Sequence, residues 1–356
     1  MKLRKLLIPG LAIGGAGALC AGAALAGLAV AGASGVCALR RRRSGRSLRG
    51  KVVVIGGGSR GLGLAMAEEF GRQGATLVLA ARGADELDRA RIHLAHRGAE
   101  DVLTVAADLT QPDEANEVIR RATERFGRVD ILVNNAGMIT VGPVENQRLE
   151  DFRKVMEVNF FTAVHSTLAV LPQMLERREG TIVNIASVGG KVAVPHLLPY
   201  SASKFALVGF SEGLHAELRG KGIHVLTVCP GLMRTGSHLG AYFSGNAERE
   251  YEWFSLAANL PGVSTSATHA ARRIVRAVTA RHTEIAITPQ AMAAARLSAV
   301  VPEVTLRVLA LANRLLPAAA ENGSQEPRQG AEVRSREWKP ATAMGGTAAR
   351  RYNQSS

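Results

Sequence analysis

Residues 51–63 read KVVVIGGGSRGLG and decide the fold. The Val and Ile run predicts a buried strand, and the glycines after it predict a tight turn. Apolar residues at helical spacing then run from about Leu62 to Gln73, and a second apolar run spans Thr76–Ala81. The order strand, turn, helix, strand is typical of a dinucleotide-binding unit.

The glycines of this turn point to the ligand. Gly57, Gly61 and Gly63 permit positive φ angles and a close approach of the backbone to a pyrophosphate. The helix start behind them offers unpaired N–H groups to phosphates. A tight connection without a ligand is the alternative, but a position between a strand and a helix favours nucleotide binding.

The same alternation continues along the chain and predicts an α/β fold. Seven strands separated by helices indicate one doubly wound, Rossmann-type parallel sheet with helices on both faces. The predicted strands are Lys51–Gly57, Thr76–Ala81, Val102–Ala107, Val129–Asn134, Thr181–Ala186, His224–Cys229 and Glu284–Thr288.

Cofactor preference is predicted from the end of the second strand. An NAD enzyme places a carboxylate there for the ribose 2′-hydroxyl, but this chain has Arg82. Arg82, together with Arg60 in the glycine turn, can bind a 2′-phosphate, which favours NADP over NAD. Two solvated surface arginines are the alternative.

The net charge of +14 is concentrated at the N-terminal side. Residues 1–50 hold nine Lys or Arg and no acid, whereas residues 51–317 hold 29 basic and 26 acidic residues. The body also lacks basic residues interleaved with stacking aromatics, so no nucleic-acid partner is expected.

An uncharged run from Leu6 to Leu39 precedes the body, with basic residues on both sides. Its 34 residues exceed the roughly 20 that cross a bilayer. A membrane anchor over residues 1–49 is expected, and the larger cluster Arg40–Arg43 predicts a catalytic domain facing the cytoplasm. A cleaved signal peptide is the alternative, but its apolar region is normally shorter. A single span and a hairpin both remain open.

The cysteines carry no predicted chemistry. Cys20, Cys37 and Cys229 show neither zinc-ligand nor disulfide-framework spacing. Cys229 ends a predicted strand, where a buried structural thiol is expected.

Tyr200 and Lys204 are four residues apart at the start of a predicted helix, so they share one helix face. An adjacent ammonium and a cationic nicotinamide are expected to lower the phenol pKa, so that Tyr200 can exchange a proton with a substrate oxygen. Ser187 follows the fifth strand and could hydrogen-bond the same oxygen. The plain alternatives are a helix or turn cap for Ser187 and a solvated helix face for Lys204.

With these residues the chain resembles a short-chain dehydrogenase/reductase of the compact NADP-preferring type. The resemblance covers about residues 50–290 and rests on motifs in the family's order and spacing. These are GGGSRGLG, Asp108, Asn134-Asn135-Ala136-Gly137, Asn159, Ser187, Tyr200-Ser-Ala-Ser-Lys204, Pro230-Gly231 and Thr235. One departure is Gly56, where the family usually has Thr.

The resemblance implies a catalytic tetrad of Asn159, Ser187, Tyr200 and Lys204. In it Asn159 holds a water of a proton relay, and Lys204 also binds the nicotinamide ribose. Asp108 would contact the adenine, and Thr235 the carboxamide. The implied cofactor-binding residues are Gly57, Ser59, Arg60, Gly61, Leu62, Gly63, Arg82, Asp108, Leu109, Asn135, Ala136, Gly137, Tyr200, Lys204, Pro230, Gly231 and Thr235.

The remaining segments complete a four-part division: anchor 1–49, catalytic domain 50–298, amphipathic helix 299–317 and disordered tail 318–356. The aromatic-rich stretch 242–254 corresponds to the family's substrate lid. Its rings suit a bulky apolar substrate, or they simply pack the lid onto the sheet. The helix face holding Val300, Val304, Val308, Leu311 and Leu315 suits a bilayer surface, the protein's own core or a partner subunit.

The sequence thus predicts an NADP(H)-dependent oxidoreductase that acts on a small-molecule carbonyl or alcohol, such as a lipophilic or 3-ketoacyl compound, and that works as a homo-oligomer without a metal. A membrane-tethered NADPH sensor or scaffold without turnover is the alternative, which loss of a tetrad residue would favour. A related sugar-nucleotide epimerase or dehydratase would need a different glycine spacing and a longer substrate domain.

Overall fold

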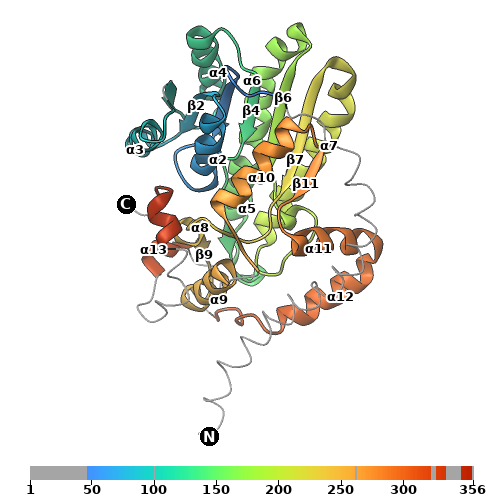
Figure 1. Cartoon of the computed structure of the whole chain (residues 1–356). Helices are drawn as coiled ribbons and strands as arrows, with labels where there is room; N and C mark the ends of the chain where they lie inside the picture. The colour runs from blue at the N-terminus through green and yellow to red at the C-terminus, as the bar shows by residue number, and fades with distance from the viewer. Residues whose placement is uncertain (1–45, 100, 261–262, 322–325, 334–345, 355–356) are drawn as a thin grey trace, which may run out of the picture.

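The computed structural model describes residues 46–99, 101–260, 263–321, 326–333 and 346–354. Its centre is a parallel sheet with the strand order β11-β7-β6-β4-β1-β2-β3 (Figure 1). All seven predicted strands are present, so the predicted α/β fold is confirmed. They are β1 (Val52–Gly56), β2 (Thr76–Ala81), β3 (Val102–Ala106), β4 (Ile131–Asn134), β6 (Gly180–Ile185), β7 (Ile223–Cys229) and β11 (Glu284–Ala286).

Helices cover both faces of this sheet because its strands are apolar on both sides. One apolar core joins the sheet to α2 (Gly61–Arg72), α3 (Ala84–Ala95) and α10 (Ala267–Thr279). A second core joins the other face to α4 (Pro112–Phe126), α6 (Thr162–Arg177) and the end of α7 (Leu198–Leu218).

The chain reverses its direction of winding between β1 and β4. After β1 it moves outward through β2 and β3, and it then returns to place β4 on the other side of β1. Gly56 of β1 pairs with Asn134 of β4, so both strands end level at the same edge. Ligands of doubly wound sheets bind outside the carboxyl ends of the strands at such a point.

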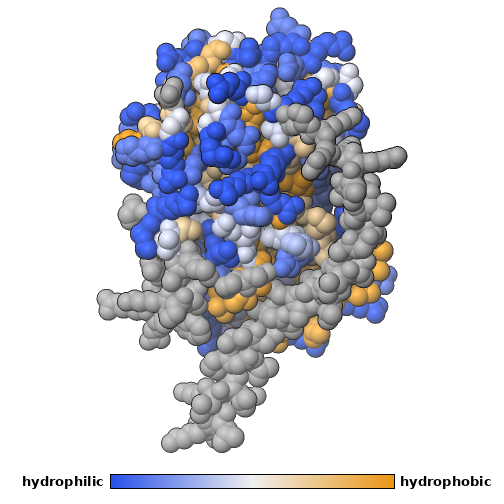
Figure 2. All heavy atoms as spheres, in the orientation of Figure 1, coloured by the Kyte–Doolittle hydropathy of each residue, from blue (hydrophilic) through white to orange (hydrophobic). Residues whose placement is uncertain are grey.

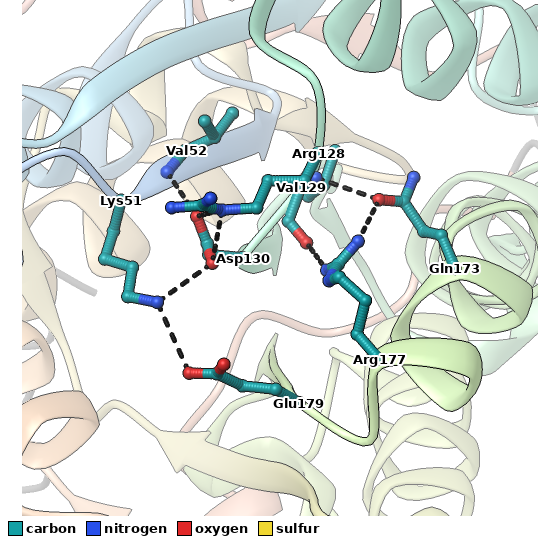
Figure 3. Close-up of polar contacts among 8 residues, drawn as sticks. All are labelled: Lys51, Val52, Arg128, Val129, Asp130, Gln173, Arg177 and Glu179. Atoms are coloured by element: carbon teal, nitrogen blue, oxygen red, sulfur yellow. Dashed lines mark hydrogen bonds and ion pairs between the residues drawn. The ribbon is translucent and has the colours of Figure 1, made fainter.

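A polar cluster holds the opposite edge of the sheet together (Figure 3). The Asp130 carboxylate accepts hydrogen bonds from Val52 N–H at 2.9 Å and from the Lys51 ammonium at 3.0 Å. Arg128 also pairs with Asp130, at 3.0 Å. Burial opposes ionisation of Asp130, but these donors outweigh it and hold its pKa below the usual value.

The lid lies beyond the carboxyl ends of the strands. It contains α8 (Ser237–Gly240), β9 (Tyr242–Phe243) and α9 (Ala247–Asn259). Its strand β9 pairs with β5 (Thr140–Val141) and with β12 (Arg328–Gln329). A second short pair joins β8 (Met233–Arg234) to β10 (Thr265–Ser266).

The structure differs from the expected tail 318–356, because parts of it are folded. Residues 328–329 add the strand β12 to the lid, and Val333 of α13 (Gly330–Val333) is buried among lid residues. Residues 346–351 form a helical turn that ends at the buried Tyr352. The segment is mostly polar, so the sequence did not indicate the contacts that a few widely spaced apolar residues make.

The predicted helix 299–317 is also altered. Pro302 lacks an N–H, so α11 (Pro289–Val300) ends before it and α12 (Pro302–Asn313) begins with it. The apolar face is on the outside of the molecule: Val300 is 77% exposed and Leu311 is 62% exposed. Packing of this face on the protein's own core is therefore wrong. Figure 2 shows apolar side chains on the surface where α12 lies.

The predicted anchor, Cys20 and Cys37 lie outside the described residues, apart from residues 46–49 of the anchor range. Among the described helices, none combines the length and apolar character needed to span a bilayer.

Candidate active site

The glycine-rich turn runs from the end of β1 into α2 and is tightly packed. Gly57 has φ +71°, and a Cβ on it would lie 2.9 Å from the backbone of Ala136. The Asn135 amide donates to the Gly57 carbonyl at 2.9 Å. Arg60 precedes α2 without a side-chain cap, so this helix start matches a phosphate-binding cradle. The residues present therefore fit a dinucleotide.

Glu86 holds the outer side of this turn. Its carboxylate accepts from the Ser59 hydroxyl at 3.1 Å and from the Arg60 guanidinium at 3.2 Å. Arg82 at the end of β2 is exposed, and the described residues provide no hydrogen-bond or ion-pair partner for it. A 2′-phosphate could pair with Arg82 directly, whereas Arg60 would have to leave Glu86.

The segment after β3 places Asp108 and Leu109 near this turn. Asp108 accepts two hydrogen bonds from Thr110, through the backbone N–H at 3.0 Å and the hydroxyl at 2.9 Å. A Cβ on Gly56 would lie 2.9 Å from Leu109 Cδ1. The departure from Thr at Gly56 therefore has a physical reason, because Leu109 fills the space that a side chain would need.

Two glycines show how the predicted tetrad is assembled. A Cβ on Gly189 would lie 3.2 Å from the Tyr200 ring and 3.4 Å from Ser187 Oγ. A Cβ on Gly137 would lie 3.2 Å from Asn159 Oδ1 and 3.6 Å from Lys204 Nζ. The structure thus brings together Ser187 with Tyr200 and Asn159 with Lys204. Lys204 Nζ is also 5.9 Å from the Tyr200 ring centroid.

The environment of Tyr200 and Lys204 shifts both pKa values. Burial raises the pKa of Tyr200, and its hydrogen bond with Ser187 opposes this only in part. The lowering of this pKa that is expected from the Lys204 ammonium together with a bound cationic nicotinamide stays a prediction. Burial also lowers the pKa of Lys204 to about 8. The buried Cys229 behaves as a structural thiol, because burial raises its pKa to about 12.

Asn159 lies in a π-helical turn, Glu157–Phe161, between α5 (Leu149–Met156) and α6. Its Oδ1 accepts from Met138 N–H at 2.7 Å, and its Nδ2 donates to the Met138 carbonyl at 3.1 Å and to Ser203 Oγ at 2.9 Å. Through these hydrogen bonds the Asn159 side-chain amide fixes the segment after β4 against α7.

The loop after β7 closes the site on the side of Ser187. The Pro230 carbonyl accepts from Val188 N–H at 2.8 Å. A Cβ on Gly231 would lie 2.7 Å from Thr288 Oγ1, so this position is closely packed. Thr235 is buried, and its hydroxyl accepts from Ser237 N–H at 3.3 Å.

Comparison with known proteins agrees with this geometry. The family described as "short chain dehydrogenase" matches residues 51–240. The chain belongs to the short-chain dehydrogenase/reductase family. Two solved structures of this family are similar over most of their length. One, from Streptomyces avermitilis, is 32% identical with a TM-score of 0.63, covering 72% of this chain and 95% of that one. The other, from Burkholderia phymatum in complex with NAD, is 29% identical with a TM-score of 0.66, covering 74% and 96%.

Curated short-chain dehydrogenase/reductase relatives match over a shorter part. "Dehydrogenase/reductase SDR family protein 7-like" of Anopheles gambiae is 39% identical over 57% of this chain and 65% of its own length. "11-beta-hydroxysteroid dehydrogenase 1A" of Arabidopsis thaliana is 38% identical over 57% of this chain and 58% of its own length. The matched region spans less than two thirds of both relatives.

Sequence reasoning missed a buried cluster that joins the lid to the catalytic helix. His196 Nδ1 lies 2.9 Å from Glu250 Oε1, and Trp253 Nε1 donates to Glu250 Oε2 at 2.7 Å. Glu250 is fully buried, and His196 lies four residues before Tyr200 with φ +62°. His196 and Glu250 are 54 positions apart, and no motif in the sequence links them.

A second missed group is a buried hydrogen-bond chain across the sheet below the tetrad. Asn134 donates to Asn184 at 2.8 Å, and Asn184 donates to Ser211 at 3.0 Å. Ser211 in turn bonds the Thr227 hydroxyl at 2.7 Å. The chain fixes the mutual positions of β4, β6, β7 and α7.

Proposed function

We propose that this chain is an NADP(H)-dependent oxidoreductase that interconverts a carbonyl compound and an alcohol, with Tyr200 as general acid and base. The observation that carries the proposal is the grouping of Asn159, Ser187, Tyr200 and Lys204 around Gly137 and Gly189. The proposal is supported by the order of the strands, because Gly137 and Ser187 follow β4 and β6, which end level with β1 at the edge that carries the glycine-rich turn.

When bound beside this group, a nicotinamide would supply the hydride that reduces the carbonyl carbon. Tyr200 gives its phenolic proton to the carbonyl oxygen, and Ser187 hydrogen-bonds that oxygen as negative charge develops. Lys204 stabilises the resulting phenolate by its charge and binds the nicotinamide ribose. A relay past Lys204 and Asn159 returns a proton to Tyr200, and oxidation reverses these steps.

The proposed cofactor set is the one given by the family resemblance, from Gly57 to Thr235. Preference for NADP is supported by the exposed Arg82, by Arg60, and by the absence of an acid at the end of β2. The NAD complex of the Burkholderia phymatum relative concerns that protein, so nucleotide preference needs direct measurement.

An apolar, bulky substrate is proposed from the residues around Tyr200. Tyr200, Ile139, Val194 and Trp253 are partly buried against the lid core. Phe243, Tyr251 and Phe254 lie inside that core, so these rings hold the lid together. These partly buried apolar side chains suit a lipophilic ketone, and the panel should include a steroid-like compound because one relative is named as a hydroxysteroid dehydrogenase.

Membrane attachment and assembly are part of the proposal. The uncharged segment 6–39 would anchor the chain with its catalytic domain facing the cytoplasm. The exposed α12 face with Val304, Val308 and Leu311 would rest on the same bilayer. The proposal keeps the four-part division of the chain, with a tail 318–356 that is folded in part. The enzyme is also proposed to form homo-oligomers.

The direct test is NADPH oxidation by the purified chain against lipophilic ketones, aldehydes and 3-ketoacyl thioesters, with NADH alongside. Turnover that is at least about tenfold faster with NADPH at low concentration supports the proposal. Tight nucleotide binding without turnover of any compound would support a sensor or scaffold instead.

A further inference from the structure

Residues 346–354 lie on the glycine-rich turn (Figure 1, red, beside α2 and α8). The Tyr352 carbonyl accepts from Gly61 N–H at 2.8 Å. The Asn353 amide donates to the Ser59 carbonyl at 3.1 Å and to the Glu86 carbonyl at 3.0 Å. The contact between Asn353 and Ser59 joins residues that are 294 positions apart in the sequence.

The segment is held in place by specific contacts. The Tyr352 ring is only 2% exposed and belongs to the core between the sheet, α2 and α10. Its hydroxyl bonds Thr268 Oγ1 at 2.6 Å. Arg351 pairs with Glu68 at 3.4 Å, and Arg89 Nε donates to Asn353 Oδ1 at 2.9 Å.

The segment also reaches the loop proposed to meet the nicotinamide. A Cβ on Gly236, which follows Thr235, would lie 2.6 Å from Ala349 Cβ and 3.1 Å from Gln354 Cβ. A Cβ on Gly61 would overlap the Gln354 side-chain amide. Gln354 therefore lies between the glycine-rich turn and the loop after β7.

These contacts use the groups that a dinucleotide needs. The first N–H groups of a helix and the space above a glycine are what allow a pyrophosphate to approach the backbone. Here the Tyr352 carbonyl accepts the hydrogen bond of the Gly61 N–H, and the Gln354 side chain fills the space above Gly61.

We propose that residues 346–354 are an intramolecular ligand of the dinucleotide groove, and that they must leave Gly61 before a nicotinamide dinucleotide binds. This inference rests on the proposed function. The apparent affinity for the cofactor is then reduced by the fraction of molecules in which the groove is open.

The experiment compares NADPH dissociation constants by fluorescence titration of the full-length chain in detergent. The double variant Tyr352→Ala/Asn353→Ala is expected to bind NADPH about tenfold more tightly, because its groove is open more often. Arg350→Ala, an exposed change in the same segment, is the matched control and should bind as the parent does. Asn353→Ala alone, which spares the buried ring, should tighten binding about threefold.

Equal or weaker NADPH binding by these Asn353 variants would overturn the inference and leave the proposed function intact. Absence of NADPH binding in every protein would instead contradict the proposed function. Hydrogen exchange of the Gly61 N–H tests the contact of this N–H with the Tyr352 carbonyl separately. Faster exchange in Asn353→Ala than in the parent supports the inference, and an unchanged exchange rate overturns it.

Discussion

The proposed preference for NADP depends on Arg82, whose side chain is exposed directly after β2. Arg82→Ala should raise the NADPH dissociation constant about tenfold and change the NADH value less than about twofold, because only NADPH carries the phosphate that Arg82 pairs with. Titration of both nucleotides measures this. Arg91→Ala, an exposed arginine on α3, is the control. Equal effects on both nucleotides would contradict the assignment of NADP.

The lowered pKa of Lys204 predicts that the rate of carbonyl reduction depends on pH. Its pKa in the folded protein is about 8, so its stabilising ammonium is present below pH 8 and is lost as the pH rises. The value of kcat/KM for carbonyl reduction should therefore fall above about pH 8. A pH profile from 6 to 10 measures it, and a flat profile would contradict the role of Lys204.

Single residues differ in how far the sequence could predict them. Tyr200 and Lys204 are close in sequence, so helical spacing places them on one face. The bonds of Asn159 to Met138 and Ser203 depend on the packing of separate elements. The same is true of the raised Tyr200 pKa, because burial is a property of the folded protein.

At the scale of elements, Glu250 links the lid helix α9 to His196 in the loop before α7. Glu250→Gln should raise KM about tenfold and change kcat less than about threefold, because the pair positions the lid and touches no reacting atom. Steady-state kinetics separates the two constants. Glu252→Gln, on an exposed position of the same helix, is the control. A fall in kcat with KM unchanged would contradict this role.

The elements themselves were predictable where the pattern is local. Short runs rich in Val, Ile and other apolar residues located all seven strands of the main sheet. The tail was not predictable, because β12 is two residues long and exists only through its pairing with β9. Pro302 was a visible signal for the break between α11 and α12, but the apolar stripe across it suggested one helix.

At the scale of the whole molecule, the two edges of the sheet have different tasks. The carboxyl edge carries the proposed chemistry, and the amino edge carries the cluster around Asp130 (Figure 3). Asp130→Asn should lower the free energy of unfolding at pH 7 by about 2 kcal/mol, because it weakens several hydrogen bonds to a charged group.

The sign of its pH dependence follows from the lowered pKa of Asp130. The carboxylate stabilises the fold above its unfolded pKa of about 3.9, and this stabilisation is lost as the pH falls through the folded value. The difference between parent and variant should therefore shrink below about pH 4. Denaturant unfolding at several pH values measures it, with the exposed Asp101→Asn as control. A difference that does not change with pH would contradict this account.

The central claim is that Tyr200 transfers the proton while the rest of the site holds the nucleotide. The most direct measurement is single-turnover NADPH oxidation by Tyr200→Phe, with Tyr242→Phe in the lid as the matched control. The account predicts a loss of at least about 100-fold in Tyr200→Phe, NADPH binding within about threefold of the parent, and near-normal turnover in the control. Turnover by Tyr200→Phe within about tenfold of the parent would contradict it.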